Sequence, residues 1–200
     1  MGLINELIGA SFQLILMSLV PFIVWLITSR KKEKFVLWLG LKKPICEQSI
    51  KIIVIAVMVY VTYALLTVLA IKSLPSGITT AGSQFAGYGV SGIPIALVYG
   101  FIRTGLSEEI FFRGFILKRI QGRWGFKVGN LIQAILFGAM HGIPFGIVTR
   151  SIPATLLLTV LPGAIGWFQG WLNEKKCDGS IVPSWLLHGT MNFISTCLSL

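Results

Sequence analysis

Several polar side chains with catalytic potential are embedded in otherwise apolar stretches of the chain. Two adjacent carboxylates, Glu108 and Glu109, lie in the segment SEEIFFRGF at positions 107–115. Two imidazoles, His141 and His188, and a carboxamide, Asn192, follow in later apolar stretches. A carboxylate can act as a general base, and an imidazole or a carboxamide can donate hydrogen bonds to a developing oxyanion. These residue types are those of a hydrolytic site.

Helical spacing separates the charged residues of this segment into two groups. Glu109 and Arg113 are four residues apart, so we expect them to share a helical face and to form an ion pair. Glu108 lies about 100° around the helix from Glu109 and is not neutralised by that pair. Phe112 shares its face. We therefore interpret Glu108 as the candidate general base and Glu109 with Arg113 as a structural pair.

The two histidines lie at similar positions along their helices. His188 and Asn192 are four residues apart and present an imidazole and a carboxamide on one face, while Phe137 lies one turn before His141. At about 1.5 Å per residue, Glu108 and His141 lie roughly 15–20 Å from the basic ends of their predicted helices, and His188 lies roughly 15 Å from the polar segment that ends near Asp178. Ionisable side chains at such depth in a membrane usually face a protein interior or a watery cavity. We expect one shared site.

The composition indicates which elements must position these residues. The 200-residue chain is 54% hydrophobic and only 12% charged, whereas a soluble domain is about a quarter charged. Apolar blocks of roughly 20 residues predict an all-α polytopic membrane protein with an intramembrane polar cavity. We expect about six spans in one compact domain, near residues 3–28, 50–71, 92–117, 128–147, 152–172 and 181–199. Segment 72–91, rich in Gly, Ser and Thr, is interpreted as a loop.

The net charge of +10 is concentrated in alternate connections between these blocks. Lys72 and Arg150 are the main basic residues of the other connections. The positive-inside rule therefore places the basic connections in the cytoplasm and both termini outside. A nucleic-acid binder would more often spread its charge over one face of a folded domain, so we expect membrane lipid and no nucleic acid as partners. The basic residues concerned are Arg30, Lys31, Lys32, Lys34, Lys42, Lys43, Lys118, Arg119, Arg123, Lys127, Lys175 and Lys176.

The three cysteines give no motif of their own. Cys46, Cys177 and Cys197 form neither a CxxC pair nor a cluster with histidine. Their spacing implies neither a disulfide framework nor a zinc finger. We expect them to be small buried or loop residues.

Taken in order, the polar motifs resemble those of a known family. The segments EEIFFR at 108–113, FGAMH at 137–141 and HGTMN at 188–192 are similar to the EExxxR, FxxxH and HxxxN motifs of the CPBP/Abi family of intramembrane proteases. That family includes the type II CAAX prenyl endopeptidases. The resemblance covers about residues 90–195. It implies a division into N-terminal transmembrane helices and a loop (1–89) and a catalytic helical core (90–200).

The resemblance also implies roles for individual residues. Glu108 would be the catalytic carboxylate and would activate water together with His141, while His188 and Asn192 would hold the oxyanion. The substrate would be a peptide bond of a membrane-associated or prenylated peptide or protein at the cell membrane.

The resemblance leaves the cofactor open. Proteins similar to this one are commonly labelled metalloproteases, and Glu108, His141 and His188 could hold Zn²⁺. HExxH is absent and asparagine is a poor zinc ligand, so we favour a mechanism without metal.

Two other classes of function compete with proteolysis. Some members of the family that this chain resembles are linked to immunity, so a non-proteolytic membrane partner or a bacteriocin self-immunity protein is the main alternative. A small transporter with carboxylates as proton relays is disfavoured, because the sequence shows no internal repeat.

Overall fold

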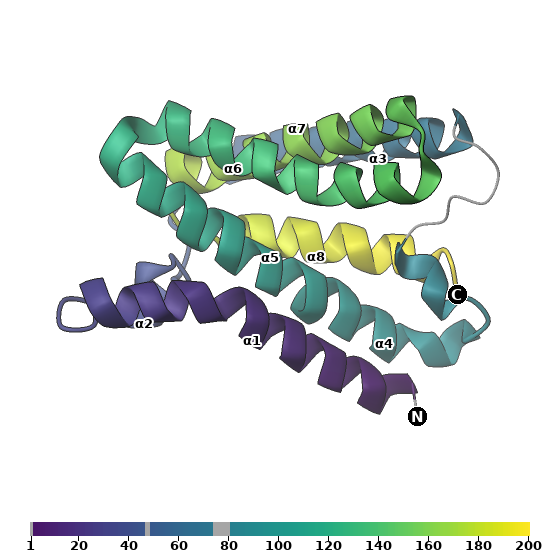
Figure 1. Cartoon of the computed structure of the whole chain (residues 1–200), viewed down its shortest axis with the longest axis horizontal. Helices are drawn as coiled ribbons and strands as arrows, with labels where there is room; N and C mark the ends of the chain where they lie inside the picture. The colour runs from purple at the N-terminus through teal and green to yellow at the C-terminus, as the bar shows by residue number, and fades with distance from the viewer. Residues whose placement is uncertain (1, 47–48, 74–80) are drawn as a thin grey trace. The chain divides into compact units, whose positions relative to one another are not determined.

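A computed structural model describes residues 2–46, 49–73 and 81–200, and every regular element in these ranges is helical (Figure 1). Within them, four helical segments are long and apolar enough to cross a membrane. The predicted class, an all-α polytopic membrane protein, is confirmed. The four segments are Gly2–Thr28, Ile50–Leu69, Gly89–Thr149 and Ile152–Lys176.

The third of these segments contains two of the predicted spans. Its 61 residues would extend about 90 Å as one straight helix, roughly three times the thickness of a bilayer core. The chain turns instead at Gly125, whose φ of 80° and ψ of 164° are not helical. Beyond the turn the chain returns on itself, since a Cβ on Gly129 would lie 3.0 Å from the Leu117 carbonyl oxygen. The predicted connection at 118–127 is therefore a helical turn region, and the predicted sixth span is the short, 16-residue α8 (Val182–Cys197).

The chain forms two compact units that are interleaved along the sequence. Unit 1 consists of Met1–Lys43, Thr79–Phe115 and Ser180–Leu200, and unit 2 of Pro44–Ile78 and Ile116–Gly179. Part of the predicted loop 72–91, residues 74–80, lies outside the described residues, and the rest of it includes two short 3₁₀ turns.

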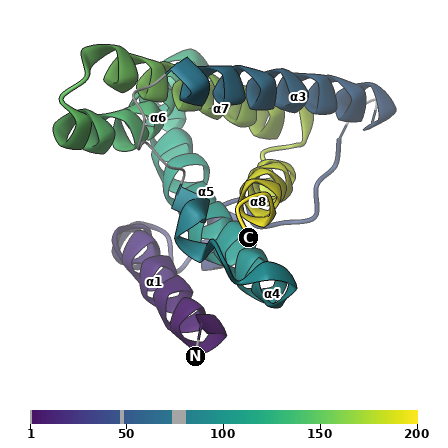
Figure 2. The same ribbon diagram turned by 90° about the vertical axis from the view of Figure 1, so that its right-hand side faces the viewer.

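Unit 1 is built around a helical segment that leads from α4 to the first residues of η4. The segments η3 and η4 have the wide turns of a π-helix, a form that is frequent at functional sites. Helices α1 and α8 both pack against η3 (Figure 2). The elements are α1 (Gly2–Thr28), α2 (Phe35–Trp38), η1 (Ala81–Phe85), η2 (Gly89–Gly92), α4 (Ile93–Leu97), η3 (Val98–Leu106), α5 (Ser107–Glu109), the first part of η4 (Ile110–Leu117) and α8.

Unit 2 contains three helices that lie side by side, α3 (Ser49–Ser73), α6 (Lys118–Thr149) and α7 (Ile152–Lys176) (Figure 1). Helices α6 and α7 approach closely because small residues meet between them, as is common in membranes. A Cβ on Gly142, for example, would lie 1.9 Å from Thr159 Oγ1. Buried carboxamides add polar links: Gln133 Nε2 donates to the Gly166 carbonyl oxygen at 2.9 Å, and Gln169 Nε2 donates to the Tyr60 hydroxyl oxygen at 2.6 Å.

Two of the cysteines, expected as buried or loop residues, also form a disulfide that their spacing did not imply. Cys46 and Cys177 form a disulfide within unit 2, across 131 residues of sequence. Cys46 precedes α3 and Cys177 directly follows α7, so the bond ties the start of one helix to the end of another. Sequence spacing could not reveal this bond, because two cysteines so far apart become neighbours only through the packing of α3 on α7.

Candidate active site

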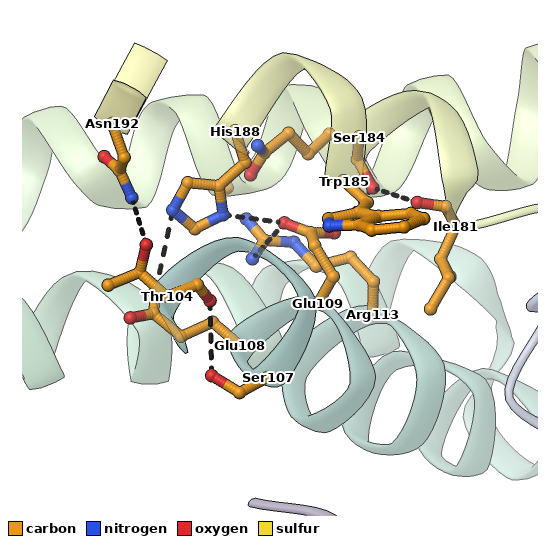
Figure 3. A network of polar contacts seen from close by, with 12 residues as sticks. Thr104, Ser107, Glu108, Glu109, Arg113, Ile181, Ser184, Trp185, His188 and Asn192 are labelled. Carbon is orange, nitrogen blue, oxygen red and sulfur yellow. Dashed lines mark hydrogen bonds and ion pairs between the residues drawn. The ribbon is translucent and has the colours of Figure 1, made fainter. Parts of the chain in front are cut away.

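Unit 1 contains a polar cluster formed by Glu108, Glu109, Arg113, His188 and Asn192. This cluster depends on a close approach between η3 and α8. A Cβ on Gly100 would lie 2.7 Å from the backbone nitrogen of Phe193, and one on Gly189 would lie 2.4 Å from the Phe101 ring. Only glycines allow the two helices to come this near. Because Gly189 directly follows His188, the contact brings the imidazole against the helix that carries Glu108 and Glu109 (Figure 3).

Glu109 is the hub of this cluster (Figure 3). Glu109 and Arg113 are fully buried, at 0% exposure each, and Arg113 Nη1 lies 3.1 Å from Glu109 Oε1. The same Oε1 lies 3.1 Å from His188 Nδ1, while Oε2 accepts a hydrogen bond from Ser184 Oγ at 2.5 Å. A carboxylate has several acceptor positions and no donor. Glu109 thus compensates the Arg113 charge and also orients the His188 ring.

The second nitrogen of His188 faces the other glutamate. Its Nε2 lies 3.7 Å from Glu108 Oε2, and Glu108 is 7% exposed. Since Nδ1 donates to the Glu109 carboxylate, Nε2 is the ring nitrogen that faces Glu108. The two adjacent glutamates therefore have different surroundings: Glu109 is enclosed by Arg113, Ser184 and His188, whereas Glu108 lies opposite Nε2 of the imidazole.

Asn192 lies one turn further along α8 and is oriented by a hydroxyl of η3. Asn192 Nδ2 donates to Thr104 Oγ1 at 2.8 Å. The Thr104 hydroxyl is 2.9 Å from the carbonyl oxygen of Tyr99 and 3.2 Å from that of Gly100. Because its single proton goes to these carbonyls, its oxygen accepts the hydrogen bond from Asn192. This arrangement fixes which end of the carboxamide faces η3 and leaves the second N–H of Nδ2 as a further donor.

His141, the remaining predicted site residue, belongs to α6 of unit 2. Its Nδ1 lies 2.7 Å from the carbonyl oxygen of Phe137, and the two rings pack at a centroid distance of 4.5 Å. A carbonyl oxygen can only accept, so Nδ1 carries the proton and Nε2 of the neutral ring is the basic atom. Unit 1 brings Glu108, Glu109, Arg113, His188 and Asn192 together, whereas His141 lies in unit 2, where its hydrogen bond to Phe137 defines the tautomer.

Sequence reasoning missed two residues of the unit 1 cluster. Ser184 lies four residues before His188, and Thr104 lies four residues before Glu108. Each therefore shares a helical face with a residue that was predicted, and its hydroxyl holds another residue of the cluster. Inspection of the polar residues one turn before each predicted residue would have found both.

An intramembrane ion pair outside the cluster was also missed. Arg103 Nη1 of η3 lies 2.9 Å from Glu6 Oε2 of α1, and Glu6 is only 4% exposed. The Arg103 guanidinium also lies 5.9 Å from the centre of the Tyr99 ring. Buried ionisable groups in membranes generally pair with one another. This pair links α1 to the helix that carries the site.

Of the three residues that could hold zinc, Glu108 and His188 belong to unit 1 and His141 belongs to unit 2. A catalytic zinc usually has three ligands from the protein. Within the part of the chain that the structure describes, no group of three or more His, Cys, Asp or Glu side chains is arranged to hold a metal ion.

Long apolar helices with buried carboxylates and a buried imidazole, next to a half-buried carboxamide, define a helical membrane protein with a polar interior site. Residues 90–194, more than half of the chain, match the model of the type II CAAX prenyl endopeptidase Rce1-like family. The chain belongs to this family, and the resemblance noted in the sequence is confirmed. Family membership supports a peptidase that acts in a lipid environment on a peptide substrate. No curated protein and no solved structure matches the chain.

The close approach of η3 and α8 gives a testable prediction. In Gly100→Ala the new Cβ would lie 2.7 Å from a backbone nitrogen of α8, so α8 must move and carry His188 and Asn192 with it. Because a misplacement of about 1 Å can lower catalysis about 100-fold, we expect the turnover number to fall by roughly that factor while the helices still form. The matched control is Gly122→Ala, where a Cβ meets nothing within 4 Å. Equal turnover of both variants in a peptide-cleavage assay would contradict the prediction.

Proposed function

We propose that this protein is an intramembrane endopeptidase that hydrolyses a peptide bond of a membrane-associated substrate. The observation that carries the proposal is the 3.7 Å distance between Glu108 Oε2 and His188 Nε2, with the imidazole held from behind by Glu109. A carboxylate opposite an oriented imidazole supplies a base and a hydrogen-bond donor on two sides of one reacting group.

In the proposed reaction, Glu108 and His141 activate a water molecule for attack on the scissile carbonyl carbon. The inclusion of His141 rests on the family motif, and its Nε2 is the basic atom because Nδ1 donates to the Phe137 carbonyl oxygen. As the C–O bond forms, the carbonyl oxygen gains negative charge. Protonated His188 Nε2 and the second N–H of Asn192 donate hydrogen bonds to that oxygen. Collapse of the tetrahedral intermediate breaks the C–N bond, and the proton taken from water is passed to the leaving amine.

The proposed setting is the cell membrane, crossed several times, with the basic connections in the cytoplasm. The substrate class proposed is a membrane-associated peptide or protein, with or without a prenyl group.

The proposed mechanism requires no metal, and a direct cleavage experiment tests it. The purified protein is reconstituted in nanodiscs and incubated in ¹⁸O water with two membrane peptides that differ only in a C-terminal prenyl group. We expect cleavage, incorporation of one ¹⁸O into the new carboxylate, and no loss of rate with 1,10-phenanthroline. Mass spectrometry reads all three results. Absence of cleavage of either peptide, or activity that persists in His141→Ala, would contradict the proposal, and inhibition by the chelator would contradict its metal-free form.

The alternative roles are separated by one variant. A self-immunity protein or membrane partner without catalysis would keep its protection or its partner binding in Glu108→Gln, because binding needs no general base. A peptidase loses its biological effect together with cleavage. Proton flux coupled to a solute in liposomes would instead indicate a transporter.

A further inference from the structure

The connection between α1 and α2 in unit 1 is a compact basic loop (residues 29–34). It follows α1 directly and carries four cations against one carboxylate, that of Glu33. All four cationic side chains are exposed. They are Arg30, Lys31, Lys32 and Lys34.

This basic loop has a defined shape. Trp25 Nε1 donates to the Glu33 carbonyl oxygen at 2.9 Å, across eight residues of sequence. The backbone N–H of Arg30 donates to the Trp25 carbonyl oxygen at 2.9 Å, and that of Lys32 to the Ser29 carbonyl oxygen at 2.9 Å. The cations are thus carried by a closed turn, so little ordering is required before they bind a ligand.

Two hollows adjoin the turn. One of about 590 Å³ is lined by residues 26–32, and another of about 480 Å³ is lined by Trp25 and residues 30–35. Both volumes are within the roughly 300–1,000 Å³ range of small-ligand sites. The lining of the first changes from apolar to cationic over seven residues: Leu26 and Ile27 precede Thr28 and Ser29, and Arg30, Lys31 and Lys32 follow.

The residues around this change of polarity are typical of a membrane surface. Ile27 is 78% exposed at the end of an apolar membrane-type helix. The rings of Phe22, Trp25, Phe35 and Trp38 pack against one another beside the loop, with neighbouring centroids 5.5 Å apart for Phe22 and Trp25 and 6.3 Å for Phe35 and Trp38. Tryptophan is enriched at the level of the lipid headgroups.

We propose that the first hollow, lined by residues 26–32, binds the phosphodiester headgroup of an anionic phospholipid. Arg30, Lys31 and Lys32 contact the phosphate, and Leu26 and Ile27 contact the first part of an acyl chain. Guanidinium and ammonium groups are the usual partners of phosphate, and basic residues next to a membrane helix attract anionic lipids. The apolar part of the lining favours a lipid over free phosphate, because an inorganic anion makes no use of exposed leucine and isoleucine.

Lipid titration followed by native mass spectrometry tests the proposal on the whole protein in detergent. We compare phosphatidylglycerol with phosphatidylcholine of the same acyl chains, for the wild type and the triple variant Arg30→Gln, Lys31→Gln, Lys32→Gln. We expect the wild type to bind phosphatidylglycerol at least about 10-fold more tightly than phosphatidylcholine. The triple variant should lose about 10- to 100-fold in affinity for phosphatidylglycerol and much less for phosphatidylcholine, whose choline cation offsets the charge of its phosphate.

The control variant removes the same charge elsewhere. Lys51→Gln, Arg123→Gln, Lys127→Gln also lacks three exposed cations, all in unit 2, and should bind phosphatidylglycerol within about twofold of the wild type. An equal loss of affinity for phosphatidylglycerol in both triple variants would overturn the proposal, because the net charge of the protein would then account for lipid binding. Displacement of the lipid by inorganic phosphate, but not by sodium chloride of equal ionic strength, would assign the hollow to a free anion. Photoreactive phosphatidylglycerol should label the peptide that spans residues 22–38. Labelling confined to other peptides would also overturn the proposal.

Discussion

Glu108→Gln is expected to lower the turnover number for peptide cleavage by about 10²–10⁴-fold, the usual contribution of a general base. The amide has the same shape as the carboxylate, so the fold and the 7% exposed position of the side chain should be kept. What is lost is the ability to take a proton from water. The turnover number and the Michaelis constant are measured in nanodiscs on the peptide that the wild type cleaves.

The control for this variant is Glu33→Gln, which removes an exposed carboxylate of the connection between α1 and α2. It should match the wild type in both kinetic constants. A Glu108→Gln protein with wild-type turnover would remove Glu108 from the mechanism. If the Michaelis constant rose and the turnover number stayed the same, Glu108 would be a binding residue.

Arg113→Met is expected to destabilise the protein by about 3–5 kcal/mol, because it leaves a buried carboxylate without its cation. Arg113 and Glu109 are both at 0% exposure and 3.1 Å apart, and methionine fills much of the same volume. We expect low accumulation in membranes and early aggregation on heating in detergent. Size-exclusion chromatography after a temperature series measures the effect.

The double variant Glu109→Gln, Arg113→Met separates charge from packing. With the carboxylate also removed, no buried charge is left uncompensated, so stability should return at least in part. Activity should not return, because the Glu109 carboxylate also orients His188. Normal stability of Arg113→Met alone would show that Glu109 does not need this cation, and the structural part assigned to the pair would be wrong.

The sequence predicted those features that depend on residues close together along the chain. The i,i+4 spacing of Glu109 and Arg113 predicts their contact because both residues lie on one turn of one helix. The apolar blocks predict the helical class because a bilayer core demands them. The order of motifs predicts the family, since each motif is short and continuous in sequence.

The contacts that the sequence did not predict join residues that are far apart along the chain. Ser184 meets Glu109 from 75 residues away, and Glu6 meets Arg103 from 97 residues away. Each partner is ordinary by itself: a serine at the start of a helix, and a carboxylate near the beginning of the first apolar block. The π-helical turns of η3 and η4 also escaped, because hydrophobic periodicity is read at 3.6 residues per turn.

The Cys46–Cys177 bond has a consequence for the orientation of the chain. Each cysteine follows a pair of lysines within a few residues, Lys42 with Lys43 and Lys175 with Lys176. Cytosolic glutathione keeps thiols reduced, whereas the periplasm and the extracellular space allow them to oxidise. The state of these two sulfur atoms in intact cells, read by maleimide labelling before and after a reducing agent, therefore reports which compartment the disulfide-bonded end of unit 2 faces. A bond that is intact before reduction would contradict the proposed placement of the neighbouring lysines in the cytoplasm.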